Sequence, residues 1–314
     1  MTSFKKWVVT WWEVSRATYA LPVLLPVALS GVIVASRVQF NPLLFSLTFI
    51  GVGMLALGSY MTNDYFDYKS GVDARKKEYL NYSGLSHIVY RRGNPIVTGR
   101  VKANSVLYAS VVCFILALLI GIYLTIKVDS LILMLGAVGF LIAYFYSAPP
   151  VDLSSHALGE ILPGIAYGPL AMIGTYYVLS KTFTLEIVLI SIPVGIFVSL
   201  IRWVDAIPGY EAHKAVGETK LTTILGRRRA VGFIPLFLAV IYLGILAEVV
   251  AGILPLATLL VFLSLPLAIK VVKISRESCG ETNRFMKAIP LILKCYVLSL
   301  VLLIVGYIPY MSRL

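Results

Sequence analysis

Apolar residues occur along this chain in long uninterrupted runs that are separated by shorter polar segments. Each run is roughly 20 residues long, the length a helix needs to cross a hydrocarbon core of about 30 Å. The runs are continuous rather than alternating, so the pattern predicts helices and not the strands of a barrel. We expect about nine membrane-spanning helices. They lie near residues 17–36, 43–62, 104–126, 130–147, 157–178, 186–205, 231–251, 254–271 and 289–310.

Composition supports a membrane location. Hydrophobic residues make up 59% of the chain and charged residues only 13%, whereas soluble domains average about 25% charged residues. We therefore expect one integral-membrane domain over residues 1–314, an all-α polytopic bundle around a central cavity. Lys5 and Lys6 precede Trp7, Trp11 and Trp12, a pattern typical of an interfacial anchor ahead of a first helix that is retained.

The basic residues predict the orientation in the membrane. The net charge is +12, and 23 of the 27 Lys and Arg residues fall at the N-terminus or in the loops that follow even-numbered spans. Loops rich in Lys and Arg stay in the cytoplasm, so the N-terminus and the long loops 63–103 and 205–230 are expected on the cytoplasmic side. The membrane is expected to be the cell membrane. The remaining four basic residues fall on the opposite side: Arg37, Lys127, Lys181 and Arg313.

An acidic cluster follows the second predicted span. Asn63, Asp64 and Asp67 share one face if that helix continues through them, and Asp73 comes six residues later. Clustered oxygen ligands suit Mg²⁺, which takes one or two carboxylates and completes its shell with water and phosphate. The alternative is an ordinary polar helix end at the membrane interface.

A second acidic cluster follows the sixth span, four spans later. Pro208 and Gly209 are expected to break the helix between Asp205 and Glu211, so these two carboxylates can converge on a second metal position. The alternative is a solvated loop.

Basic residues accompany both clusters. Cations beside a phosphorylated group stabilise the charge that develops when it leaves, although most of these residues also serve membrane topology. The candidates are Lys69, Arg75, Arg91, Arg92, Lys214 and Lys220. Tyr146 lies in an aromatic segment, where the face of its ring could shield a carbocation. The alternative is that it belongs to an aromatic belt at the membrane interface. The basic residues form no aromatic-interleaved surface, and we expect no nucleic-acid partner.

These motifs resemble the UbiA superfamily of intramembrane prenyltransferases over nearly the whole chain. Asn63-Asp64-x-x-Asp67 is similar to the first aspartate-rich motif of that family, and the segment from Pro208 to Glu211, with Gly217 and Leu225-Gly226, is similar to the second. The segments 91–100, 146–150 and 158–160 also fit. Asp73, six residues after Asp67, and the run 168–177 are closest to the 1,4-dihydroxy-2-naphthoate branch of menaquinone synthesis.

The resemblance implies Mg²⁺-dependent transfer of an isoprenyl group from a prenyl diphosphate to an aromatic quinone precursor or a lipid acceptor. Asn63, Asp64 and Asp67 would hold one ion, and Asp205 and Glu211 a second. Asp73 would orient or deprotonate the acceptor, assisted by Lys69 and Tyr146 at the reacting centre. The diphosphate would contact basic residues of both loops, and the prenyl tail would lie along apolar helices. The basic residues implied are Arg75, Arg91, Arg92, Lys214 and Lys220.

The chain also departs from the family pattern. Gly209 and His213 stand where relatives commonly carry Asp, and Ile201-Arg202 replaces the Asn-Asn pair of the naphthoate branch. Either Asp205 and Glu211, with His213, would then supply the second metal position, or the second metal would bind weakly. A secondary transporter or ion-coupled carrier is the alternative function. Charges paired across helices near the middle of the membrane would favour it, but only Glu248 lies clearly inside a span. A membrane scaffold would leave the Asp clusters without a role.

Overall fold

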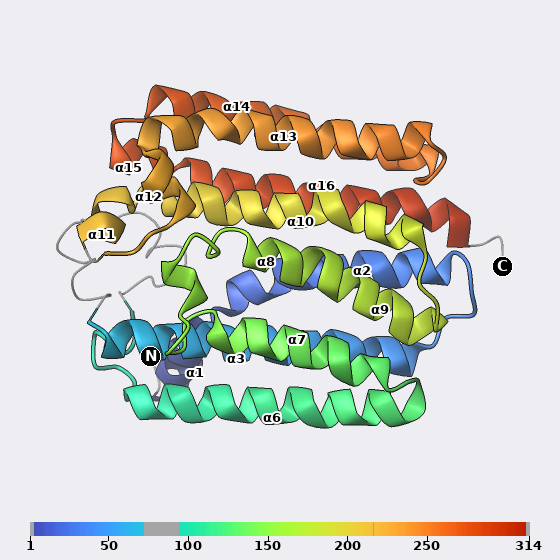
Figure 1. Cartoon of the computed structure of the whole chain (residues 1–314), viewed down its shortest axis with the longest axis horizontal. Helices are drawn as coiled ribbons and strands as arrows, with labels where there is room; N and C mark the ends of the chain where they lie inside the picture. Colours follow the sequence, from blue (N-terminus) through green and yellow to red (C-terminus); the bar gives the residue numbers. More distant parts are fainter. Residues whose placement is uncertain (1–2, 72–93, 216, 312–314) are drawn as a thin grey trace.

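Long helices, arranged side by side, form the bundle (Figure 1). The computed structural model describes residues 3–71, 94–215 and 217–311. Asp73, Arg75, Arg91 and Arg92 therefore lie outside the described residues. Within the described ranges the regular secondary structure is entirely helical, and six helices are long and apolar enough to cross a membrane. The predicted all-α polytopic class is confirmed.

The first half of the chain carries α1 to α9. The bounds are α1 Ser3–Val14, α2 Ala17–Ala35, α3 Pro42–Lys69, α6 Ala103–Lys127, α7 Leu131–Phe145, the short 3₁₀ turn η1 Leu153–Ser155, α8 Leu162–Ile165, the π-helical turn η2 Ala166–Leu170 and α9 Ala171–Ser180.

The second half begins with α10, the most deeply buried of the six helices that are long enough to cross a membrane. The molecule buries 61% of the residues in its apolar stretch. The bounds are α10 Leu185–Ala206, α11 Tyr210–Ala215, α12 Leu221–Leu225, α13 Arg227–Val250, the 3₁₀ helix η3 Leu256–Ser264, α14 Leu265–Glu277, α15 Thr282–Phe285 and α16 Ala288–Met311.

Each of the nine predicted spans coincides with helical structure, but two are less regular than expected. The predicted span 157–178 becomes helical only at Leu162 and passes through η2 before it continues as α9. Pro169 lies inside η2, where its missing N–H removes a helical hydrogen bond and favours the wider turn. The predicted span 254–271 starts as the 3₁₀ helix η3 and becomes α14 at Leu265.

Glycines hold this irregular segment tightly against α10. A Cβ on Gly168 would lie 2.4 Å from the Cα of Gly195, and a Cβ on Gly164 would lie 2.5 Å from the Gly195 carbonyl oxygen. Small residues of this kind allow backbones of membrane helices to approach closely. The contact fixes α8 and η2 next to the middle of α10, which places Tyr167 at the central cavity.

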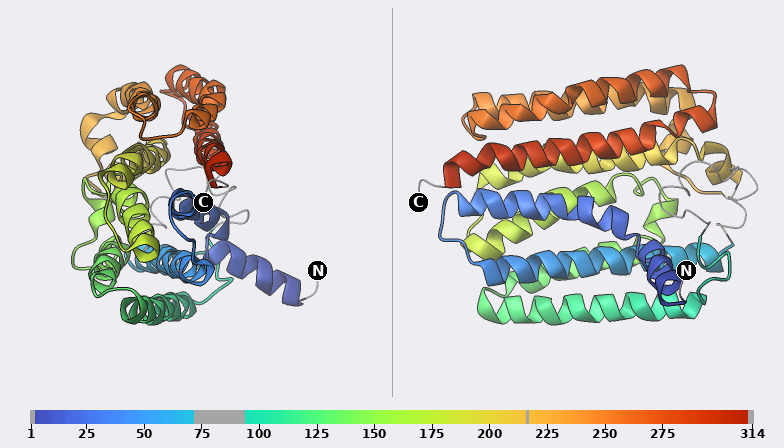
Figure 2. Two further views of the ribbon diagram at one scale, coloured as in Figure 1. Left: turned by 90° about the vertical axis from the view of Figure 1, so that its right-hand side faces the viewer. Right: turned by 180° about the vertical axis from the view of Figure 1, so that it is seen from behind.

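Both acidic motifs lie at the same end of the bundle, which we call the aspartate end; the opposite end is the far end. Helix α3 continues through Asp64 and Asp67 to Lys69. The condition for these residues to share one face of a helix is therefore met. Helix α10 ends at Ala206 and α11 starts at Tyr210, so the predicted break at Pro208-Gly209 is also found. The short helices α11, α12 and α15 gather at this end (Figures 1 and 2).

Candidate active site

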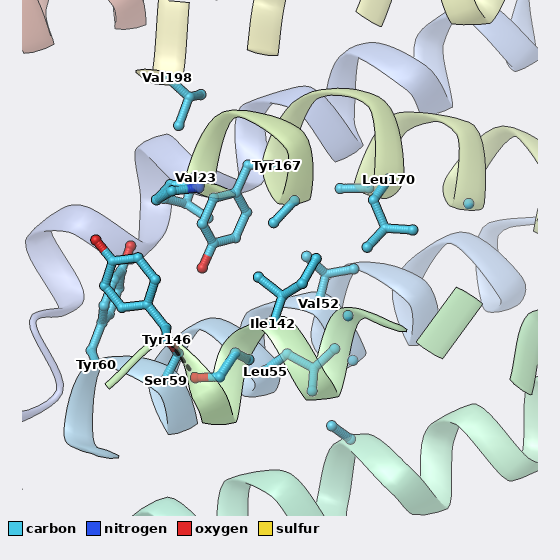
Figure 3. A pocket seen from close by; sticks show the side chains of 18 of the residues that line it. Val23, Val52, Leu55, Ser59, Tyr60, Ile142, Tyr146, Tyr167, Leu170 and Val198 are labelled. Atoms are coloured by element: carbon cyan, nitrogen blue, oxygen red, sulfur yellow. Dashed lines mark hydrogen bonds between the residues drawn. The ribbon is translucent and has the colours of Figure 1, made fainter. Parts of the chain in front are cut away.

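An elongated cavity of about 290 Å³ runs between the helices. Helices α2, α3, α6, α7, α9, α10 and α16 contribute to its wall, together with α8 and η2. Its polar lining is concentrated at the aspartate end, where the side chains of Tyr60, Tyr146 and Tyr167 gather (Figure 3). Arg16, Asn63, Arg202 and Asp205 line the same end. The rest of the wall is largely apolar.

Helix α3 presents the first acidic motif. The Asn63 side-chain amide donates to the Asp67 carboxylate over 3.2 Å and to the Ser147 hydroxyl over 2.7 Å. Asp64 is only 2% exposed and forms an ion pair with Arg16. The Arg16 guanidinium also lies 3.4 Å from the Asn63 side-chain oxygen. The three side chains of the motif therefore lie next to one another, joined by Asn63 and by Arg16.

Arg16 reaches this position from the break between α1 and α2. Its backbone has φ 48°, a left-handed conformation that is uncommon for a residue with a side chain. Its guanidinium also lies 6.0 Å from the centre of the Tyr60 ring. From the sequence, Arg16 is expected only as one of the basic residues at the N-terminus that indicate membrane orientation. Its partners lie 47 and 48 residues away along the chain, so no local pattern reveals them.

Helix α10 presents the second motif through a chain of hydrogen bonds. Arg202 donates to Asp205 over 2.9 Å and to the Tyr146 hydroxyl over 3.1 Å. The Tyr146 hydroxyl in turn donates to the carbonyl of Gly159 over 2.9 Å. Tyr146 is thus fixed in orientation, with its proton committed to the backbone. The i, i+3 spacing of Arg202 and Asp205 was the available sequence signal for this pair.

The remaining predicted residues lie outside the cavity lining. Glu211 and Lys214 are exposed on α11. Lys69 is exposed at the end of α3, with its ammonium 3.4 Å from the Tyr65 hydroxyl. Lys220 forms an ion pair with Glu218 over 3.2 Å. The structure therefore brings Asn63, Asp205 and Tyr146 to one cavity. Asp64 and Asp67 lie beside Asn63 on α3 but are not part of the cavity lining, and the other four residues lie around the aspartate end.

His213 occupies the space that a side chain at position 209 would need. A Cβ on Gly209 would lie 2.6 Å from His213 Nε2. The other ring nitrogen, Nδ1, lies 2.6 Å from the Glu218 carboxylate. The two departures from the family pattern are therefore linked, because Gly209 makes room for the His213 ring.

The donor chemistry fits a magnesium ion that also binds substrate. Across residues 3–71, 94–215 and 217–311, no three Asp, Glu, His or Cys side chains lie close enough to hold a metal ion by themselves. Asn63, Asp64 and Asp67 supply oxygen atoms only, and Arg16 shows that this position accepts positive charge. Mg²⁺ binds in this way, through one or two carboxylates with water and phosphate completing its shell.

The comparison with known protein families decides the class. The UbiA prenyltransferase family matches residues 23–309. The chain belongs to the UbiA prenyltransferase family. It is therefore an integral membrane protein and a prenyltransferase, which confirms the predicted enzyme class over the carrier alternative.

Curated relatives include members of the naphthoate branch. The 1,4-dihydroxy-2-naphthoate octaprenyltransferase of Bacillus subtilis is 24% identical over 286 residues, which cover 87% of this chain and 88% of the relative. The 2-carboxy-1,4-naphthoquinone phytyltransferase of Synechocystis is 27% identical over 216 residues, which cover 68% of this chain and 64% of the relative.

Solved structures show the same fold. A UbiA homologue from Archaeoglobus fulgidus bound to DMAPP and Mg²⁺ superposes with a TM-score of 0.63 at 15% identity. The match covers 97% of this chain and all of that one.

Proposed function

We propose that this enzyme transfers a prenyl group from a prenyl diphosphate to a naphthoate acceptor at the aspartate end of the cavity. One observation carries the proposal: Asn63 of α3 and Asp205 of α10 both line the polar end of a cavity whose remaining wall is largely apolar. Such a cavity suits a substrate with a charged head and a hydrocarbon tail. The names of the Bacillus subtilis and Synechocystis relatives support the naphthoate class of acceptor.

The magnesium ligands we propose are Asn63, Asp64 and Asp67 on α3, with Asp205 and Glu211 as the second set. When bound, Mg²⁺ would neutralise the diphosphate and so make it a better leaving group. The Archaeoglobus fulgidus structure with DMAPP and Mg²⁺ supports this donor class, since that protein has the same fold. Asn63 and Asp205 line the cavity, whereas Glu211 on α11 is exposed. Asn63 also contacts Asp67, and Arg16 contacts both Asn63 and Asp64, so the α3 set is the better supported of the two.

Basic residues would hold the diphosphate from the solvent side. Arg16 already lies against Asp64, and a diphosphate would offer its guanidinium a second anionic partner. Lys69 would stabilise the charge that develops on the leaving group. The other proposed diphosphate contacts are Arg75, Arg91, Arg92, Lys214 and Lys220.

Tyrosine rings would face the reacting carbon. Tyr60, Tyr146 and Tyr167 surround the polar end of the cavity (Figure 3). Positive charge that develops on the prenyl carbon is attracted to aromatic faces. The hydrogen bonds of Tyr146 to Arg202 and Gly159 hold its ring in place. Asp73 is proposed to orient or deprotonate the acceptor.

Product mass spectrometry tests the proposal. Purified enzyme is given a prenyl diphosphate with either 1,4-dihydroxy-2-naphthoate or an archaeal-type glycerol phosphate lipid. We expect a prenylated naphthalene product that is lost on chelation and restored by Mg²⁺. Asp64→Asn and Asp67→Asn should each lower the rate at least 100-fold.

The matched control is Asp129→Asn at the far end. Asp129 accepts from the backbone N–H of Leu131 over 2.8 Å, and Asn fills the same capping role. This variant should keep wild-type activity. Turnover that persists in both α3 variants, or that ignores chelators, contradicts the metal assignment, and transfer only to the glycerol lipid contradicts the acceptor.

A further inference from the structure

The cavity extends well beyond the reacting end. Asn63 and Thr48 both line it from α3, and the fifteen helical steps from one to the other span about 22 Å. The cavity therefore reaches from the aspartate end to within two turns of the far end of α3, which begins at Pro42.

The far half of the cavity offers a ligand almost no polar groups. The hydroxyl of Thr48 donates to the Leu44 carbonyl, and the hydroxyl of Thr175 donates to the Ala171 carbonyl, so both are satisfied within their own helices. Their neighbours in the wall include Val52, Leu124, Ile132 and Val178. This half can accept only hydrocarbon.

Glycines keep this half open. Gly121 on α6, Gly136 on α7 and Gly174 on α9 all line the cavity. Each lies five or six residues from the far end of its helix, so the three stand at a similar depth. A Cβ at any of them would meet no other atom within 4 Å. They therefore border empty space.

Close helix packing does not account for these three glycines. The packing glycines Gly164 and Gly168 would place a Cβ within 2.5 Å of a neighbouring helix; Gly121, Gly136 and Gly174 would not. Glycine in a helix interior is less favourable than alanine by about 1 kcal/mol. Three such glycines at a similar depth in the cavity wall indicate that the space beside them accommodates a ligand.

We infer that Gly121, Gly136 and Gly174 set the length of prenyl tail that the cavity accepts. The inference rests on the proposed function and specifies the length of the prenyl donor. An extended isoprene unit is about 5 Å long, from carbon–carbon bonds of about 1.5 Å, so the cavity holds roughly four units. The fourth unit lies between the three glycines, and longer tails continue past them. The geometry assigns to this enzyme a preference for donors of about four isoprene units over shorter ones.

Leucine substitutions at the glycines test the assignment. All three glycines have ordinary helical backbone, and leucine is a better helix former than glycine, so the variants should fold. Gly121→Leu, Gly136→Leu and Gly174→Leu should each lower kcat/KM for geranylgeranyl diphosphate at least 10-fold. Their kcat/KM for geranyl diphosphate should stay within twofold of wild type. The corresponding Gly→Ala variants should give smaller shifts in the same direction.

Gly232→Leu is the matched control. Gly232 lies inside α13 and is exposed on the lipid side, and a Cβ there would also meet no other atom within 4 Å. It does not line the cavity, so the preference for tail length should not change. An equal loss for short and long donors in the three cavity variants, or the same length preference in Gly232→Leu, overturns the inference.

Binding separates this inference from the proposed function. Thermal stabilisation of wild type by geranyl and geranylgeranyl diphosphate, measured with Mg²⁺, reports affinity without turnover. The cavity variants should lose the additional stabilisation given by the longer diphosphate. If wild type transfers no prenyl group to any acceptor, the proposed function fails; the binding profile then decides the tail assignment alone.

Discussion

At the scale of single residues, the contact between Arg16 and Asp64 dominates the candidate site. Asp64 is 2% exposed, and a carboxylate buried so deeply needs a compensating cation. Arg16 supplies that cation, and Mg²⁺ would bring positive charge to the same carboxylate. The site therefore has an internal partner for its key acid.

Arg16→Ala should lower the apparent Tm without added metal, because the buried Asp64 loses its ion pair with Arg16. Added Mg²⁺ should then raise the Tm more in this variant than in wild type, since binding also compensates the buried charge. Melting curves with and without MgCl₂ measure both effects. Arg16→Lys keeps the charge and should lie between the two; an unchanged Mg²⁺ shift in Arg16→Ala would contradict the account.

A second ion pair ties the far end together. Arg37, in the connection after α2, forms a two-armed contact with Glu186 in the first turn of α10. This hydrogen bonding raises the pKa of Arg37 above its already high usual value, against the opposing effect of burial. The stability it contributes is fully present below the unfolded pKa and is lost only as pH rises through the folded pKa. Both values lie far above neutrality.

Arg37→Met should therefore lower stability by about 1–2 kcal/mol. The difference in Tm between wild type and Arg37→Met should stay constant from pH 6 to pH 9, because Arg37 remains charged throughout. Thermal melts across that range provide the check. A difference that shrinks toward pH 9 would show that Arg37 loses its charge within this range, which contradicts the account.

The sequence predicted these residues unequally. Asp64 and Asp67 were found because their spacing on one helix is visible locally. Arg16 and Ser147 were missed as partners of the motif, because they contact it only after α1, α3 and the segment after α7 have packed. Side-chain partners that are distant in the sequence leave no pattern along it.

At the scale of helices, the apolar runs predicted where helices lie, whereas local breaks were less predictable. Pro22, Pro26 and Pro193 lie inside continuous helices, but Pro169 accompanies a π-helical turn. Membrane helices tolerate proline when neighbours satisfy the freed backbone groups. The outcome depends on what packs alongside, here the glycine contact with α10, and a single run of residues does not reveal it.

Gly168→Ala should destabilise the protein severely, because the new Cβ would meet the Gly195 Cα at 2.4 Å. Backbone atoms on both sides leave no flexible group to move aside. We expect reduced folded yield and a lower Tm, both readable by fluorescence-detected gel filtration. Gly232→Ala, with open space at its Cβ, should equal or exceed wild-type stability; equal behaviour of the two variants would contradict the packing account.

At the scale of the whole molecule, charged side chains gather at one end. Both acidic motifs, and most of the basic residues in the described part of the chain, lie at the aspartate end. The sequence predicted this polarity from the distribution of Lys and Arg, and the helix directions agree with it. Depth and shape of the cavity were not predictable, because seven helices distant in sequence together determine them.

Cysteine labelling tests the proposed orientation. After replacement of Cys113, Cys279 and Cys295, a single cysteine is introduced at exposed Ser70 on the aspartate end or exposed Ser130 on the far end. A membrane-impermeant maleimide should label Ser130→Cys in intact cells. It should label Ser70→Cys only after the cells are permeabilised. The reverse pattern would invert the assignment.

Helix α3, with 28 residues, is about 42 Å long, against a hydrocarbon core of about 30 Å. Its acidic motif occupies the last two turns, so this rigid helix fixes the height of the motif's carboxylates above the lipid tails. Bilayers of longer acyl chains would submerge those carboxylates, whereas shorter ones would leave them in water. Reconstituted activity should therefore depend on acyl-chain length even when the headgroup is held constant.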